Sequence, residues 1–471
     1  MISVAILGAG PAACLLAMAL RALSIKATII GSERSNRAVE GVSPRVVEAL
    51  ERLGFGGAIA RLGSPWEREA HWNGRISTGN REYLVERVYF DELLRRSASE
   101  AGVRVSIGIV RDIGQRSDGS WEIFWSERNG DLRHLDATIV VECRGSLAPR
   151  VAQDQHALPI RIALSRTYIS ERAQKRMTFV ESYREGWAWG SIDETGATHI
   201  QLTMLANSLK ANERDMDQIH ADGVQKLEGF LDRVGQKIRP SGPVRVRGVQ
   251  PMLRGSIVGR NYLRVGDAAY SVDPLSGHGI FEAVSGAMAA APVINTILHR
   301  PQDCELANDY FESRMKSLYF SRVRTAVSLY KSEERWRDHS FWTRLSSEAL
   351  IPKELAESRF VPSFREAPVV EDGFIVRRKI VVNNEFPRGV RFIDGVELHQ
   401  LSCALQTFGS DDLDSVCRCV EAQYDSVRRA VSWLRSQGLV CDSVTHSAPD
   451  EGSQGGESLS PIPCPNELTS T

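Results

Sequence analysis

The first third of the chain alternates short apolar runs with longer stretches of helical spacing. Residues 2–7 form a run rich in β-branched side chains, which is typical of a buried strand. Residues 12–23 have the length and composition of a helix, and residues 26–30 predict a second strand. Residues 90–101 predict an amphipathic helix, and residues 137–141 predict another buried strand. This order predicts an α/β domain that opens with a strand–helix–strand unit.

Between residues 155 and 255 the apolar positions recur at every second residue, which is the period of a strand with one buried face. A helix over residues 215–234 interrupts the strands. We therefore expect an antiparallel sheet that is inserted between two parts of the α/β domain. The expected strands are 160–165, 176–181, 187–192 and 198–205.

The remainder of the chain returns to the α/β pattern and then becomes helical. Residues 365–441 form a separate small unit, with a predicted hairpin at 375–392 and helices at 396–406 and 413–437. The last thirty residues are rich in Ser, Pro, Gly and Glu, so we expect disorder there. The predicted parts are 1–154 and 256–300 (α/β domain), 155–255 (sheet insert), 301–364 (helical connection), 365–441 (small C-terminal domain) and 442–471 (tail).

Composition and charge change this picture little. The hydrophobic fraction of 42%, the charged fraction of 25% and the net charge of -1 are those of an ordinary globular protein. They give no reason to expect nucleic acid or a membrane as a partner. The N-terminus shows no leader or apolar span, so we expect a cytoplasmic protein. Cys417 and Cys419 have no Cys/His pair at zinc spacing, so no metal site is expected.

A glycine motif follows the first strand and opens the first helix. Gly8 suits the tight turn, and Gly10 lets the backbone approach a pyrophosphate. Ala13 stands where the helix packs on the strand, and Pro11 and Ala12 begin a helix whose N–H groups can face phosphates. A tight turn without a ligand would use the same residues, which leaves that interpretation open.

The acidic residue that commonly ends the second strand, where it holds a ribose, is absent. Gly31 stands there instead, and Glu33 follows two residues later. Either Glu33 reaches the ribose through a shifted loop or backbone groups hold it. A solvated loop acid is an equally good interpretation of Glu33.

A second motif lies some 250 residues downstream, at 266–280. Asp267 follows a predicted strand, where its carboxylate can accept a hydrogen bond from a flavin ribityl hydroxyl. The loop after it ends at a helix start, whose N–H groups suit the electron-rich edge of a reduced flavin. A nicotinamide enzyme has no use for this segment, so the two motifs together predict bound FAD. The predicted cofactor-binding residues of this segment are Gly266, Asp267, Pro274, Gly277, His278, Gly279 and Ile280.

With these motifs, residues 1–300 resemble the group A flavoprotein monooxygenases and the related flavin-dependent halogenases. Residues 86–94 are similar to the family's Arg-x-x-Phe-Asp-x-x-Leu helix start, which implies that Arg87 lies beside the flavin or its phosphates. A surface arginine is the alternative. The family's middle Asp-Gly motif is replaced by Glu142-Cys143-Arg144-Gly145, which weakens any transfer of nicotinamide-handling residues. The resemblance implies a Rossmann-like FAD-binding domain with an antiparallel-sheet substrate insert, NAD(P)H as reductant and O2 as co-substrate.

Within this resemblance, the residues favour oxygenation over halogenation. Halogenases use a lysine near the start of the second quarter of the chain and a Trp-x-Trp-x-Ile-Pro motif. No lysine occurs between Lys26 and Lys175, and the segment from Trp187 to Asp193 keeps both tryptophans but loses the spacing and the proline. A family monooxygenase hydroxylates an aromatic ring through a flavin C4a-hydroperoxide, and the protein supplies a dry pocket.

Four side chains are candidates for catalysis and substrate contact. Asp273 and His278, in the loop expected to face the flavin, are candidate proton acceptors, although Asp273 also suits a turn and His278 a backbone contact. Trp187 and Trp189 share one strand face and either line an aromatic-substrate pocket or pack in the core.

The small C-terminal unit resembles a winged-helix-type module for docking a peptide, and it has no basic stripe of the kind that DNA contacts need. This combination resembles the flavoprotein monooxygenases of tryptophylquinone biogenesis. That resemblance implies dihydroxylation of a peptidyl tryptophan in a precursor, the small subunit of quinohemoprotein amine dehydrogenase. A halogenase, a flavin reductase of the geranylgeranyl type and a non-enzymatic flavoprotein scaffold that binds a leader peptide are the alternatives.

Overall fold

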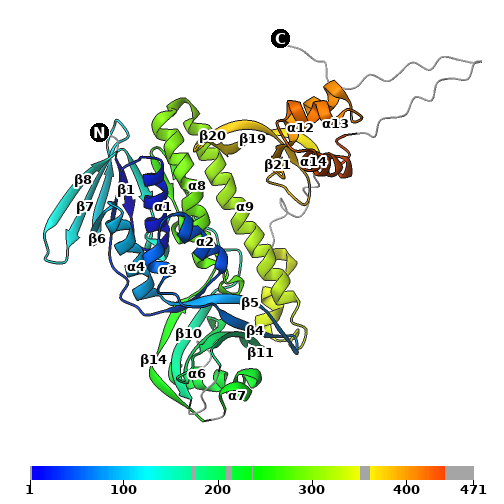
Figure 1. The fold of residues 1–471 in the computed structure, drawn as a ribbon. Helices are drawn as coiled ribbons and strands as arrows, with labels where there is room; N and C mark the ends of the chain where they lie inside the picture. Colours follow the sequence, from blue (N-terminus) through cyan, green and yellow to red (C-terminus); the bar gives the residue numbers. More distant parts are fainter. Residues whose placement is uncertain (1–2, 171–174, 208–214, 236, 351–360, 441–471) are drawn as a thin grey trace, which may run out of the picture. The chain divides into compact units, whose positions relative to one another are not determined.

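The computed structural model describes residues 3–170, 175–207, 215–235, 237–350 and 361–440 (Figure 1). The tail for which disorder is expected lies outside the described residues. The chain divides into two compact units, residues 1–358 with 366–378 and residues 359–365 with 379–471.

The first unit contains a mixed sheet built on a parallel centre. Strand β1 (Val4–Leu7) pairs in parallel with β2 (Ala27–Gly31) and β9 (Ile139–Glu142), and all four of its residues are fully buried. This confirms the strand–helix–strand opening that the apolar runs predict. The remaining strands, in sheet order β16-β17-β9-β1-β2-β6-β7-β8, are β16 (Val258–Gly259), β17 (Tyr262–Arg264), β6 (Arg104–Gln115), β7 (Trp121–Glu127) and β8 (Leu132–Ala137).

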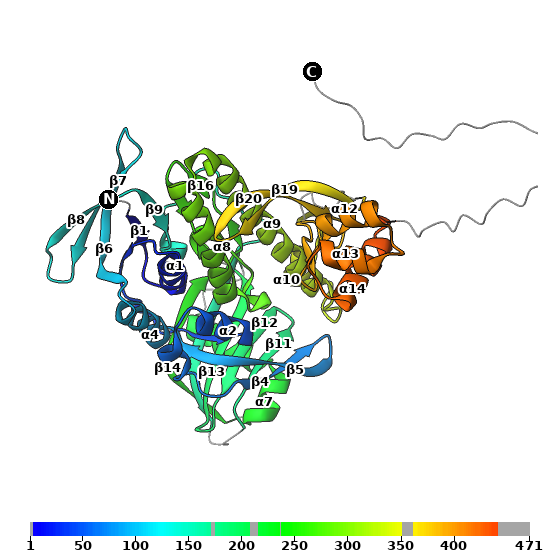
Figure 2. The same ribbon diagram turned by 45° about the horizontal axis from the view of Figure 1, so that its top comes forward.

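Helices α1 (Pro11–Ala22) and α8 (Gly279–His299) pack against each other in the core of this unit. Helix α9 (Cys304–Lys331) runs alongside α8 in both views (Figures 1 and 2). By length and composition α8 could cross a membrane, but 78% of its apolar window is buried inside the protein. Its small side chains instead allow close packing in the core. Shorter helices are α2 (Pro44–Arg52), α3 (Gly56–Ile59), α4 (Arg87–Glu100) and α10 (Ser340–Leu345).

A second eight-stranded sheet is formed mainly by the segment that the alternating pattern predicts. Three strands from residues 39–86 extend it, and β4 joins β11 in parallel. The pattern does not reveal β5, because its first seven residues are all exposed and show no alternation. In sheet order the strands are β14 (Ile238–Gly248), β10 (Arg161–Ser170), β13 (Ala197–Leu205), β12 (Gly186–Ile192), β11 (Met177–Tyr183), β4 (Trp66–Trp72), β5 (Arg75–Glu86) and β3 (Val39–Val42).

The two faces of this sheet have different neighbours. One face packs on α6 (Met216–Val224) and α7 (Glu228–Val234) through a core that includes Phe179, Leu202 and Phe230. The predicted single helix is divided in two because the Glu181 carboxylate accepts hydrogen bonds at 2.9 Å from the Gly229 and Phe230 N–H groups, which starts α7 anew. The opposite face carries Trp187 and Val180 into the core of the α/β domain. We call it the inner face.

The predicted hairpin at 375–392 is shifted toward the N-terminus in the structure. Its strands are β19 (Ser363–Glu371) and β20 (Phe374–Val382). Asp372 and Gly373 connect them with φ values of 49° and 77°, as a two-residue hairpin turn requires.

The second unit is a small helical domain. It contains β21 (Phe392–Ile393) and β22 (Val396–Glu397), followed by α12 (Leu398–Phe408), α13 (Leu413–Cys419) and α14 (Tyr424–Ser436). Leu401, Val416 and Val431 belong to its separate apolar core.

Candidate flavin site and substrate face

The glycine motif forms a tight turn between β1 and α1. Gly8 has a φ of 123°, and a Cβ on it would collide with the Cys143 carbonyl, so only glycine fits there. Gly10 caps α1 without a side-chain hydrogen bond, and Pro11 is the first helical residue. Ala12 and Ala13 are buried, and Ala12 Cβ lies 3.1 Å from the Cβ position of Gly266. The two predicted motifs therefore meet at the start of α1.

Gly31 occupies the end of β2 because no side chain fits there. A Cβ on Gly31 would lie 2.6 Å from Gly8 C and 2.7 Å from Ala9 N. Glu33 forms an ion pair with Arg128, and 37% of the Glu33 side chain is exposed. The absence of the usual acid thus has a steric cause, and a ribose contact by Glu33 stays a prediction.

Arg87 is buried at the start of α4. It donates to both Glu40 oxygens at 2.9 Å and to Asp91 at 3.0 Å. Burial acts to lower the pKa of Arg87, but these two carboxylates together raise the pKa above its ordinary value. Asp91 Oδ2 also lies 3.4 Å from Arg34 Nε and 4.0 Å from the Cβ position of Gly10. The arginine is therefore not a surface residue, and its cluster adjoins the glycine turn.

Asp267 lies in the 3-10 turn η2 (Gly266–Ala268), directly after β17. Its carboxylate is partly buried and forms no hydrogen bond or ion pair with any residue that the structure describes. Burial raises the pKa of Asp267 above its ordinary value. Gly145, from the segment that replaces the family's Asp-Gly motif, stands close to Asp267, with its Cβ position 3.9 Å from Asp267 Cβ.

These features fit an FAD. The glycine turn and the α1 N-terminus suit a diphosphate, and the Asp267 carboxylate is an acceptor that has no donor among the described residues. A ribityl hydroxyl would supply that donor.

Asp273 begins the loop that leads to α8, and it is engaged on both carboxylate oxygens. It caps the 3-10 turn η3 (Pro274–Ser276) by accepting from Leu275 N at 2.9 Å. It also forms an ion pair with Arg161, the first residue of β10, and accepts from the Tyr330 hydroxyl at 3.1 Å. Both charged side chains are fully buried. These contacts favour a role for Asp273 in positioning the loop, and a direct chemical role stays a prediction.

The rest of this loop passes over the inner face of the second sheet. Gly277 has a φ of 64°, and its Cβ position lies 3.5 Å from Arg68 Nη1 on β4. His278 precedes α8 and contacts Phe281, with 5.8 Å between ring centroids. A Cβ on Gly279 would meet nothing within 4 Å, and Ile280 is buried. We call residues 273–279 the flavin loop.

The two tryptophans of β12 have different environments. Trp187 is fully buried and donates from Nε1 to the Tyr330 hydroxyl at 3.2 Å. Trp189 is partly buried and meets His199 edge-on, with ring centroids 6.2 Å apart. Burial, together with His220 and Arg245, lowers the pKa of His199 to about 4, so its imidazole is neutral at physiological pH. Core packing thus accounts for Trp187, whereas Trp189 remains available to a ligand.

Sequence reasoning missed the buried polar residues of the inner face. Arg161 and Glu82 are buried and Arg68 is mostly so, and strand β10, which carries Arg161, lies far along the chain from β4 and β5, which carry Arg68 and Glu82. Charged residues in alternating strands are usually solvated, so no local pattern marks these three.

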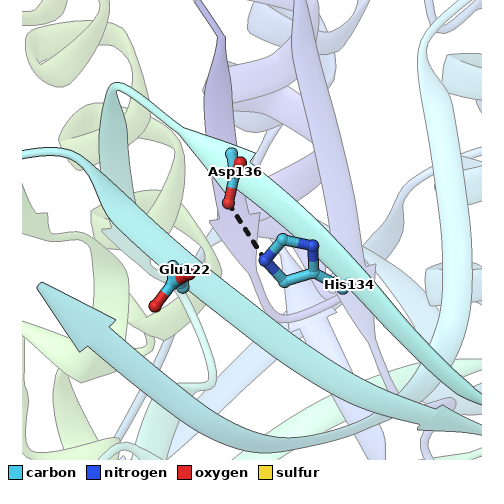
Figure 3. A group of neighbouring side chains, drawn as sticks. All are labelled: Glu122, His134 and Asp136. Atoms are coloured by element: carbon cyan, nitrogen blue, oxygen red, sulfur yellow. Dashed lines mark ion pairs between the residues drawn. The ribbon is translucent and has the colours of Figure 1, made fainter. Parts of the chain in front are cut away.

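A cluster of possible metal ligands lies on the outer strands of the first sheet (Figure 3). It comprises Glu122 on β7 with His134 and Asp136 on β8, and His134 Nε2 lies 3.0 Å from Asp136 Oδ1. Arg116 donates to Glu122 at 2.5 Å and to Asp136 at 3.0 Å. Because Arg116 already pairs with both carboxylates and the side chains are mostly exposed, we assign no metal site to them.

Comparisons with known proteins agree with this geometry. Residues 63–374, about two thirds of the chain, match the family described as tryptophan halogenase. The chain is 23% identical over 320 residues to "Tryptophan 2-halogenase" of Chondromyces crocatus, which covers 63% of this chain and 59% of the relative. It is 22% identical over 282 residues to "Flavin-dependent halogenase armH3" of Armillaria mellea, covering 54% and 56%. The chain thus spans less than two thirds of these relatives.

Among solved structures, the chain is similar to "Peptidyl tryptophan dihydroxylase QhpG essential for tryptophylquinone cofactor biogenesis". The TM-score is 0.74 at 32% identity, and the match covers 93% of this chain and 99% of the other. The halogenase CmlS gives a TM-score of 0.73 at 18% identity, with coverage of 93% and 95%, which is a likeness of fold alone.

Proposed function

The chain belongs to the tryptophan halogenase family of flavoproteins, and from that premise we propose that it is an FAD-dependent monooxygenase that hydroxylates a tryptophan side chain held in a peptide. The support for oxygenation over halogenation is the nature of the charged groups on the inner face. They include Arg68, Arg161 and Glu82, together with Arg245 and Arg247 on β14, and every lysine that the structure describes is exposed. A buried amine that could carry an oxidised halogen is thus missing from the described part of this face.

The chain's own residues bind and orient the cofactor in this proposal. The glycine turn and the α1 N-terminus hold the diphosphate, beside the cluster formed by Arg34 and Arg87. Asp267 accepts from a ribityl hydroxyl. When bound, FAD supplies the activation of O2, and NAD(P)H is the reductant.

Both ends of the flavin loop are anchored. The buried Arg161–Asp273 ion pair fixes its first residue, and its last residue, Gly279, begins helix α8. His278 stands at that helix start and is the candidate to hold a proton near the reacting ring. Trp189 and the neutral His199 offer an aromatic wall on the inner face.

A peptide substrate is supported by the likeness to QhpG, which is named a peptidyl tryptophan dihydroxylase. By that likeness the partner is a precursor protein, for which we propose the small subunit of quinohemoprotein amine dehydrogenase. Two successive hydroxylations of one indole ring would give the dihydroxylated product.

The test is intact-mass analysis of tryptophan-containing peptides after incubation with FAD-loaded enzyme, NAD(P)H, 18O2 and chloride or bromide. We expect a gain of one or two labelled oxygen atoms and no halogen. Asp267→Asn serves as the matched control with impaired cofactor binding. Incorporation of halogen would show that the enzyme is a halogenase and not a monooxygenase. If the FAD-loaded enzyme oxygenated only free phenols, a peptide substrate would be excluded.

A further inference from the structure

An arginine and a glutamate on the inner face lie beside the flavin loop. Arg68 Nη1 on β4 and Glu82 Oε2 on β5 are 4.0 Å apart, and their side chains are 24% and 10% exposed. The same Arg68 nitrogen lies 3.5 Å from the Cβ position of Gly277. Arg68 therefore reaches the part of the loop that we assign to the flavin, and Glu82 stands next to Arg68.

Glu82 keeps one carboxylate oxygen without a donor. Its Oε1 is buried and accepts no hydrogen bond from the described residues. Its Oε2 lies against Gly41 of β3, where a Cβ would overlap with it, and Oε1 lies 3.2 Å from the same Cβ position, so β3 closes one side of the carboxylate. A buried carboxylate oxygen without a donor costs free energy, and such an exception in a folded protein needs an explanation. A ligand that brings a donor would remove the cost.

Two neighbouring residues of the inner face also have groups that a ligand would contact. The β4–β11 register places Thr178 directly beside Arg68, and the buried Thr178 hydroxyl has no partner among the described residues. On the next strand, Trp189 pairs with Val180, two residues from Thr178, and so shares this face. The face therefore offers a half-buried aromatic ring together with an unused acceptor.

The buried carboxylate of the flavin loop itself, Asp273, cannot offer the same acceptor. Asp273 receives donors on both oxygens, from Leu275 N, Arg161 and Tyr330. Glu82 differs because its arginine stands at the limit of ion-pair distance and its second oxygen is unused.

We propose that Glu82 Oε1 accepts a hydrogen bond from the ring N–H of the tryptophan substrate, while Arg68 keeps the carboxylate in place. This inference rests on the function proposed above and names the group that selects an indole. An indole presents one N–H donor on an otherwise apolar ring, which matches one buried acceptor beside an aromatic wall. The same contact would stabilise positive charge on the ring nitrogen when oxygen adds to a ring carbon.

The test is a comparison of two probes on FAD-loaded enzyme, N-acetyltryptophanamide and its N1-methyl derivative. Calorimetry gives their dissociation constants, and mass spectrometry gives oxygen incorporation. The variants are Glu82→Leu and Glu82→Gln, with Glu67→Leu as the control, since Glu67 is an exposed residue of neighbouring β4 that pairs with Lys175. FAD content and circular dichroism report folding.

We expect N1-methylation to weaken binding about tenfold or more in the natural enzyme, because it removes a hydrogen bond to a charged group. In the Glu67→Leu control, N1-methylation should weaken binding by the same factor, whereas Glu82→Leu should bind both probes with equal affinity. Glu82→Gln should keep part of the preference through its amide oxygen, and it carries the test if the leucine variant does not fold.

Equal binding of both probes to the natural enzyme, or an unchanged preference in Glu82→Leu, would overturn the inference. The inference is also wrong if Glu82→Leu weakens FAD binding but still prefers N-acetyltryptophanamide over its N1-methyl derivative, because the carboxylate would then contact the cofactor. A Glu82-dependent preference without oxygen incorporation would uphold the hydrogen bond and reject the proposed reaction.

Discussion

Arg161 and Asp273 form a fully buried ion pair that joins the first residue of β10 to the first residue of the flavin loop. The Tyr330 hydroxyl accepts from Arg161 at 2.8 Å and donates to Asp273 at 3.1 Å, and Trp187 donates to the same hydroxyl. The network thus ties the sheet, the loop and helix α9 together. The network therefore fixes the position of the flavin loop over the inner face.

Replacing Asp273 with Asn should therefore destabilise the protein strongly. Removal of one partner leaves the Arg161 charge buried without compensation, which costs about 3–5 kcal/mol. Urea unfolding of the FAD-free protein measures this cost. Glu100→Gln, in the exposed pair with Arg96, should leave the stability nearly unchanged. Equal stability of the two variants would contradict the structural role of the buried pair.

Asp267→Asn should separate stability from cofactor binding. Because burial raises the pKa of Asp267 in the folded protein, the folded state binds more protons than the unfolded state, and stability is lost as pH rises through the folded pKa. Asparagine has no charge to bury, so the FAD-free variant should be the more stable protein at pH 7 and should lose this advantage at acidic pH. Its affinity for FAD should fall about tenfold or more, since a charged acceptor is lost. Thermal unfolding against pH and FAD titration measure the two effects.

The fold, and the turn and strand end that carry the expected FAD-binding residues, could be predicted from the sequence because each of these segments is contiguous. Gly8 and Gly10 stand in one turn, and Asp267 follows its strand directly. The polar groups of the inner face could not be predicted, because strand register alone brings Arg68 beside Thr178 across a hundred residues of chain.

Gly31 offers a direct test of why the ribose-binding acid is absent. Gly31→Asp places a Cβ 2.6 Å from Gly8 C, so the turn must shift, at a cost of about 1–3 kcal/mol or more. We expect a lower melting temperature and loss of FAD. Gly56→Ala is the matched control, since a Cβ there meets nothing within 4 Å and alanine favours the helix. Full FAD binding by Gly31→Asp would show that the turn adapts.

His220 should make the protein sensitive to acid. It is fully buried, its Nδ1 lies 2.9 Å from the Tyr168 hydroxyl, and burial lowers its pKa from 6.5 to about 4. The folded state therefore binds fewer protons, so stability that is present above pH 6.5 is lost as pH falls toward 4. One such histidine accounts for up to about 3 kcal/mol. Urea unfolding at pH 7 and pH 4.5 should show a smaller loss for His220→Gln, whereas exposed His134→Gln should behave like the natural protein.

The two tryptophans of β12 should respond in opposite ways to replacement by leucine. Trp187 is 1% exposed and bonded to Tyr330, so Trp187→Leu should cost about 3–5 kcal/mol of stability, measured by urea unfolding. Trp189 is partly buried and its edge contact is with His199, so Trp189→Leu should unfold at nearly the natural urea concentration and keep its FAD. The affinity of Trp189→Leu for N-acetyltryptophanamide should fall about tenfold, because a stacking surface is removed. If Trp189→Leu instead unfolded as easily as Trp187→Leu and bound the probe normally, both rings would belong to the core, and the aromatic wall of the proposed substrate site would have to lie elsewhere.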